Sequence, residues 1–105
     1  MVSNSLLHHL ADPDVLWREI AATAERRAHV LVMDLRRPET AEDARALVGE
    51  YAAGEPEVLR TDFFNSLCAA FTVDEVAAQL VRCGFGERLR VEPLGDRHLV
   101  VVGRV

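Results

Sequence analysis

The sequence predicts an α/β fold built around one central strand, and three observations support this prediction. Residues 29–35, H-V-L-V-M-D-L, form a short and nearly continuous apolar run, which is typical of a strand buried on both faces of a parallel or mixed sheet. Helical periodicity lies on both sides of this run, as in the βαβ units of parallel sheets. The last residues change to a strand period. These patterns favour one domain over residues 1–105 with a mixed sheet.

The amino-terminal segment predicts the end of a strand and then a helix over about residues 13–27. Val2 and Ser3 have the character of the last residues of a strand. Asp12 suits the N-cap because its carboxylate can accept from the amides of the first turn, and Pro13 suits the first helical position, where no N–H is needed. The expected apolar face comprises Leu16, Trp17, Ile20, Ala21 and Ala24.

Two further helices are predicted over about residues 40–53 and 56–70. Thr40 suits the N-cap of the first of these helices, and Gly54 suits its end. Apolar residues follow helical spacing in both, at Ala44, Leu47, Val48, Tyr51 and Ala52 and then at Leu59, Phe63, Leu67 and Phe71.

A fourth helix is predicted over about residues 73–83. Thr72 and Glu75 form a capping box before it. Gly84 can adopt the left-handed backbone that ends a helix, and Phe85 is expected to fold back on Leu80. The predicted buried face comprises Val76, Leu80 and Val81.

The carboxyl-terminal residues predict an antiparallel hairpin with strands 88–93 and 97–104. Gly95-Asp96 offers a tight turn between them. The first strand alternates apolar and polar residues, whereas residues 98–102 are almost wholly apolar. The last strand is therefore expected inside the sheet, between the central strand and an edge strand.

Composition limits the classes of partner and the compartment. Seventeen acidic and twelve basic residues give a net charge of -5, and no long basic run occurs, so nucleic-acid binding is not expected. Cys68 and Cys83 lack metal-ligand spacing and are expected to be small buried residues in a reducing compartment. No apolar run approaches the roughly 20 residues that span a bilayer, so we expect a cytoplasmic protein without a membrane partner.

Polar residues with possible chemistry lie near the ends of the predicted strands. Asp34, Arg36 and Arg37 follow the central strand at its carboxyl end, where open α/β sheets bind ligands. Asp34 can contact a substrate, cap a helix or pair with an arginine, whereas structural pairing is favoured for the arginines. His8 or His9 can present one imidazole to a substrate proton, and the alternative is an exposed or structural histidine pair. No Cys or carboxylate lies at a spacing that supports a metal site with these histidines.

The segment S-N-S-L-L-H-H-L-A-D-P, the strand V-L-V-M-D-L-R-R-P and the terminal hairpin together resemble the carboxyl-terminal half of a known family. This family is the class I S-adenosylmethionine-dependent methyltransferases, in the small-molecule group with a type 11-like domain. Its fourth strand ends in a segment similar to residues 3–10, and its fifth strand is similar to residues 30–35. Its seventh strand lies antiparallel between the fifth and the sixth. The resemblance implies a truncated Rossmann-like fold and methyl transfer from S-adenosylmethionine to a small-molecule acceptor.

The resemblance also implies roles for particular residues. Ser3, Asn4 and Ser5 would line the methionine end of the cofactor pocket, although these residues can also simply end a strand and turn the chain. Phe64 and Asn65 resemble the family's variable cap over the substrate and would contact the methyl acceptor. From residue type and position, and not from the resemblance, we expect His8 to act as the catalytic base and His9 and Asp34 to contact the acceptor as well. No metal is implied.

Three departures from the family matter, and the first two bear on function. The glycine-rich G-x-G-x-G loop and the acidic residue that holds the ribose are both missing. In the third, residues 25–29, E-R-R-A-H, replace the usual Pro-Gly-Gly turn, which changes only a distal turn. We therefore expect methyltransferase activity in a complete protein or complex rather than in residues 1–105 alone. The alternative hypothesis is a non-catalytic interaction or dimerisation module derived from a methyltransferase. Both hypotheses predict a homodimer or partner chain held through strand 30–35 and segment 1–10, because open sheet edges recruit strands.

Overall fold

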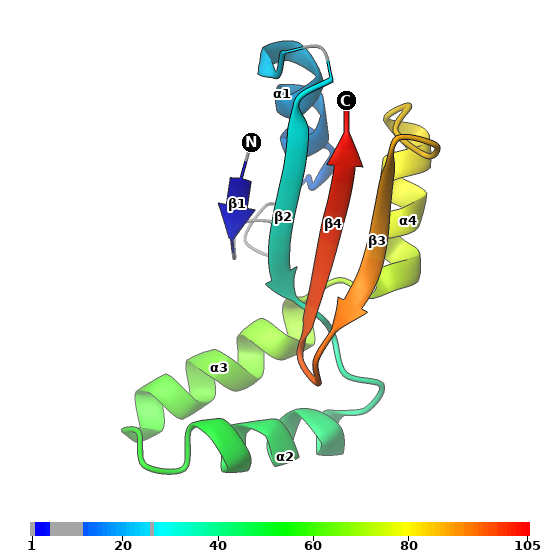
Figure 1. The fold of residues 1–105 in the computed structure, drawn as a ribbon. Helices are drawn as coiled ribbons and strands as arrows, with labels where there is room; N and C mark the ends of the chain where they lie inside the picture. Colours follow the sequence, from blue (N-terminus) through cyan, green and yellow to red (C-terminus); the bar gives the residue numbers. More distant parts are fainter. Residues whose placement is uncertain (1, 5–11, 26) are drawn as a thin grey trace.

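A computed structural model of the chain describes residues 2–4, 12–25 and 27–105 (Figure 1). Over these residues the fold is mixed α/β, as predicted. In chain order the elements are β1 (Val2–Asn4), α1 (Asp14–Thr23), β2 (His29–Leu35), α2 (Ala41–Tyr51), α3 (Glu57–Ala69), α4 (Val73–Arg82), β3 (Leu89–Leu94) and β4 (His98–Arg104).

The strands form one mixed sheet in the order β1-β2-β4-β3. β1 lies parallel to β2, with Val2 opposite Leu31 and Asn4 opposite Met33. β4 lies antiparallel to both β2 and β3. The predicted position of the last strand, between the central strand and the edge strand, is therefore confirmed.

The prediction that the central strand is buried on both faces is wrong. Side chains of β2 alternate, with Val30 and Val32 buried and His29 and Leu31 exposed. The reason is that α1 and α4 both cover the same face of the sheet (Figure 1). The main core between these layers comprises Trp17, Ile20, Val30, Val32, Val76, Leu80, Phe85, Leu89, Leu99 and Val101.

The opposite face of the sheet carries apolar side chains and no described helix. Leu31 pairs with Val102, and Met33 pairs with Val100. Because side chains alternate along a strand, these four residues point away from the main core. We call this group, Leu31, Met33, Val100 and Val102, the open sheet face. Leu31 is 42% exposed there.

Helix α1 begins as predicted but ends four residues early. Asp14 N–H donates to Asp12 Oδ1 at 3.0 Å, and Pro13 already has helical backbone angles, so Asp12 caps the helix. The helix ends at Thr23 rather than near Arg27. Arg27 has a φ of 64° and donates its N–H to the carbonyl of Val105 at 2.6 Å. The end of α1 is thus set by contact with the carboxyl terminus, which no local sequence signal reveals.

Helix α4 begins and ends with the predicted caps, but one residue predicted on its buried face is exposed. Thr72 and Glu75 form the capping box. After the helix, Gly84 has a φ of 82°, and Phe85 N–H donates to the Leu80 carbonyl at 2.8 Å, as in a Schellman motif. Val81, predicted to be buried, is 68% exposed. It lies about 140° around the helix from Val76, because each residue turns the helix by about 100°.

Helices α2 and α3 form a hairpin that extends beyond the carboxyl end of β2 (Figure 1). A second, smaller core lies between them, built on Ala44, Leu47 and Leu67 with Leu35, Val48, Phe63 and Phe64 partly buried around it. The molecule is elongated as a result, with extents of 44 × 22 × 21 Å. Because α2 covers only one side of α3, Cys68 is exposed and Leu59 is 48% exposed. The prediction that Cys68 and Cys83 are buried is wrong, since Cys83 is only partly buried.

Candidate functional site at the carboxyl edge of the sheet

The carboxyl ends of β1 and β2 lie at the same edge of the sheet because the two strands are parallel. A cavity of about 490 Å³ lies at this edge, between the loop after β2, helix α2 and the turn of the β3–β4 hairpin. Its lining comprises Arg36, Arg37, Pro38, Glu39, Asp43, Ala46, Leu47, Glu50 and Asp96. This is the edge at which open α/β sheets bind ligands.

The two arginines of this edge are held by protein contacts. Arg36 donates to the carbonyl oxygens of His98 at 2.8 Å and Gly95 at 3.0 Å, which fixes the loop after β2 to the hairpin. Arg37 forms an ion pair with Glu75 at 3.0 Å. These contacts agree with the structural roles favoured for both residues. Four carboxylates and two guanidinium groups line the cavity, so its net charge is negative.

Asp34 lies beneath this edge rather than in the cavity lining. It is 1% exposed, and its Oδ1 accepts from the N–H of Leu35 at 2.7 Å. Burying a carboxyl group raises the free energy of the folded protein unless hydrogen-bond donors surround the group. The backbone next to Asp34 therefore has to keep its donors in place. Its predicted contact with a substrate stays a prediction.

Phe64 and Asn65 lie elsewhere, on α3. Phe64 is half-buried and lines a second cavity, of about 350 Å³, between α2 and α3. The guanidinium of Arg45 lies 5.6 Å from the centre of its ring. Asn65 is exposed. Neither cavity is lined by Asp34 together with Phe64 or Asn65, and the predicted contacts of these three residues with one methyl acceptor stay predictions.

The remaining predicted site residues lie at the amino terminus. Ser3 and Asn4 belong to β1, and their backbone pairs with Val32 and Met33. Ser5, His8 and His9 lie outside the described residues. The roles assigned to these residues in cofactor binding, catalysis and acceptor binding stay predictions.

Sequence reasoning missed a cluster that joins α2 to the hairpin turn beside the cavity. Tyr51 donates its hydroxyl proton to Asp96 Oδ2 at 2.5 Å. The guanidinium of Arg97 lies 3.8 Å from the centre of the Tyr51 ring and pairs with Asp96 at 3.0 Å. The Tyr51 hydrogen bond lowers the pKa of Asp96, and the same bond raises the pKa of Tyr51. No spacing in the sequence brings residues 51 and 96 together, so only the fold reveals this contact.

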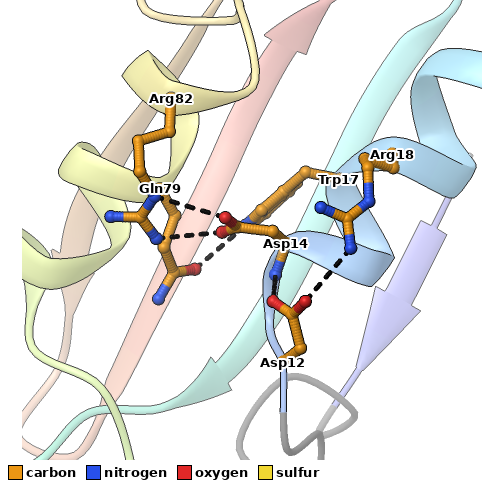
Figure 2. A network of polar contacts seen from close by, with 6 residues as sticks. All are labelled: Asp12, Asp14, Trp17, Arg18, Gln79 and Arg82. Carbon is orange, nitrogen blue, oxygen red and sulfur yellow. Dashed lines mark hydrogen bonds and ion pairs between the residues drawn. The ribbon is translucent and has the colours of Figure 1, made fainter.

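A second missed cluster joins α1 to α4 (Figure 2). Trp17 donates its indole N–H to Gln79 Oε1 at 3.0 Å, and both residues are buried. Arg82 donates to both carboxylate oxygens of Asp14, at 2.9 Å and 3.2 Å, which lowers the pKa of Asp14. The one sequence feature that indicates this cluster is Gln79, an amide side chain among the apolar residues on the buried face of α4. The cluster joins two helices that lie on one face of the sheet.

Two negative findings concern the described residues only. No group of three or more His, Cys, Asp and Glu side chains within ranges 12–25 and 27–105 is arranged to hold a metal ion. None of the four described helices has the length and apolar character needed to cross a bilayer.

Comparison with known proteins gives no relative. No protein-family model matches the chain, and neither the curated proteins nor the solved structures yield a significant match. The function must therefore be argued from the fold and the site.

Proposed function

We propose that residues 1–105 form the carboxyl-terminal half of a class I S-adenosylmethionine-dependent methyltransferase domain that acts on a small molecule. One observation carries this proposal, namely the order and direction of the strands. β1 and β2 are parallel, with α1 between them in the chain, as the fourth and fifth strands of the family would be. β4 is antiparallel and lies between β2 and β3, as the seventh strand would lie between the fifth and the sixth.

The described residues supply only part of a cofactor site. The cavity at the carboxyl edge is lined by the carboxylates of Glu39, Asp43, Glu50 and Asp96 and by no aromatic side chain. Such a lining does not fit an adenine ring, which needs a largely apolar pocket. The adenosine end of the cofactor therefore has to be bound by other residues, in the complete protein or in a complex.

In methyl transfer this chain would orient the methyl acceptor and remove its proton. Methyl transfer is an in-line displacement in which the cofactor supplies the electrophile and the protein orients the acceptor and excludes water. We assign Ser3, Asn4 and Ser5 to the methionine end of the cofactor and His8 to removal of the acceptor proton. His9, Asp34, Phe64 and Asn65 are the proposed acceptor contacts.

A second candidate function is a non-catalytic interaction module, and the open sheet face favours it. Sheets that contain parallel strands are normally covered on both faces. Here both covering helices lie on one face, and Leu31 and its neighbours are left on the other. For either function we propose a cytoplasmic location, since free thiols such as Cys68 persist in reducing compartments.

Titration calorimetry with S-adenosylmethionine tests the first proposal against the second. For a methyltransferase half we expect weak but saturable heat at millimolar cofactor, equal heat with S-adenosylhomocysteine and none with ATP. Asn4→Ala should abolish this heat, whereas Asn65→Ala should not change it. Absence of heat at millimolar cofactor would reject the cofactor role and favour the interaction module.

A further inference from the structure

A second candidate site lies on the α2–α3 hairpin, in the cavity of about 350 Å³. We call it the α2–α3 groove. Glu57, Arg60, Thr61 and Phe64 occupy positions i, i+3, i+4 and i+7 of α3, so they share one face of that helix. Arg45 and Val48 face them from α2. The groove is thus built by the helical period of two packed helices.

The groove carries an excess of positive charge, because two guanidinium groups and one carboxylate line it. Arg18, Arg37, Arg82, Arg90 and Arg97 lie in ion pairs. Across residues 12–25 and 27–105, neither Arg45 nor Arg60 has a carboxylate within the 4.0 Å of an ion pair. Glu57 is the one acidic residue of the lining, against two guanidinium groups. A carboxylate ligand would therefore find two donors in the planar geometry that suits it.

The floor of the groove is apolar and aromatic. Phe64 and Val48 are partly buried and pack on the second core, so their positions are fixed by the fold. The guanidinium of Arg45 lies over the ring of Phe64, 5.6 Å from its centre, and this cation–π contact holds the positive charge above the apolar floor. An aromatic ring packed on Val48 and against the edge of the Phe64 ring would thus place an attached carboxylate next to Arg45.

We propose that the α2–α3 groove binds a small aromatic carboxylate. A cavity of this volume lies at the small end of the range for ligand pockets, which suits one or two fused rings. The net charge of -5 on the chain disfavours a polyanion, whereas the local arginines favour a single negative charge. The groove shares Phe64 with the proposed acceptor contacts. The inference goes beyond the proposed function because the other groove residues have no role there, and because Arg45 and Val48 lie on the side of α2 opposite to Asp43, Ala46 and Glu50 of the carboxyl-edge cavity.

NMR titration with 2-naphthoate tests the proposal, with 2-naphthalenemethanol as the uncharged probe. We expect saturable amide shifts confined to α2 and α3 with naphthoate and much weaker binding of the alcohol. Arg45→Gln and Arg60→Gln should each raise the Kd by about fivefold, the upper end for one exposed ion pair. Arg88→Gln is the matched control, since Arg88 is also exposed and lies outside the groove.

Phe64→Leu separates the aromatic contribution from the charge, and the dispersion of the amide spectrum shows whether this variant is folded. We expect it to weaken naphthoate binding while leaving the weaker binding of cyclohexanecarboxylate unchanged. The proposal is overturned if naphthoate shifts are scattered over the surface, if the alcohol binds equally well, or if Arg88→Gln weakens binding as much as Arg60→Gln. None of these outcomes bears on the calorimetry with S-adenosylmethionine.

Discussion

Gly103 is a position where the backbone of the sheet excludes any side chain. Its φ is 150°, a value that residues with a Cβ rarely adopt, and an added Cβ would collide with the carbonyl oxygen of Arg88. Gly103→Ala is expected to lower the free energy of unfolding by about 3 kcal/mol or more, from strain plus overpacking. Urea denaturation followed by circular dichroism measures this loss.

Gly49 provides the matched control for Gly103. It lies within α2, and an added Cβ would meet nothing within 4 Å. Gly49→Ala should therefore raise the free energy of unfolding by up to about 1 kcal/mol, because alanine is the better helix former. Equal effects of the two substitutions would contradict the backbone geometry described for Gly103.

The buried hydrogen bond between Trp17 and Gln79 gives a second prediction for single residues. Gln79→Met keeps the length of the side chain but leaves the indole N–H of Trp17 without its acceptor. The expected loss of stability is about 1–3 kcal/mol, the cost of a buried unsatisfied donor. Val81→Thr, on the exposed side of the same helix, should change stability by no more than about 0.5 kcal/mol. A Gln79→Met variant as stable as Val81→Thr would show that this bond does not stabilise the α1–α4 contact.

For whole helices and strands, the sequence predicts those ends that depend on neighbouring residues in the chain. The capping box of Thr72 and Glu75 and the Gly84 C-cap were both predicted, because each depends on residues within one turn of the helix end. The end of α1 was missed because Arg27 bonds to Val105, at the other end of the chain. The contact between Tyr51 and Asp96 was missed for a similar reason, since these two residues lie far apart in the sequence.

The attachment of α2 to the hairpin turn predicts a pH dependence. The hydrogen bond from Tyr51 lowers the pKa of Asp96. The ionised Asp96 carboxylate therefore stabilises the folded protein above the ordinary aspartate pKa, and this stabilisation is lost as the pH falls through the lowered pKa. The same hydrogen bond raises the pKa of Tyr51. The protonated phenol therefore stabilises the folded protein below the ordinary tyrosine pKa, and this stabilisation is lost as the pH rises through the raised pKa. The attachment is therefore expected to hold across neutral pH.

Tyr51→Phe tests this attachment directly. Without the phenol hydroxyl, the pKa of Asp96 should rise toward its ordinary value, as measured by NMR titration of the carboxyl carbon. The pKa of Asp14, which Arg82 lowers, should not change and serves as the internal control. An unchanged pKa of Asp96 in this variant would mean that the hydrogen bond does not form in solution.

At the scale of the whole molecule, the order of the strands was predictable and the burial of the sheet was not. A solid apolar run predicted a strand covered on both sides, and the hairpin pattern placed β4 between its neighbours. The structure confirms that order, but the described helices α1 and α4 both lie on one face of the sheet. An apolar run shows that its side chains favour burial, but it does not show whether another element of the same chain covers each face.

This difference gives the last prediction, which concerns self-association. β1 pairs with Leu31–Met33, so part of the β2 edge is already covered, and the open sheet face is left as an apolar surface without a described helix. If this surface is covered by a second copy, Leu31→Lys should convert the dimer to a monomer, because a charge would be buried in an apolar contact. Sedimentation velocity at micromolar concentration measures the change. Val81→Lys places the same charge on an exposed valine of α4 and should leave the dimer intact. A wild-type chain that sediments only as a monomer would contradict homodimerisation.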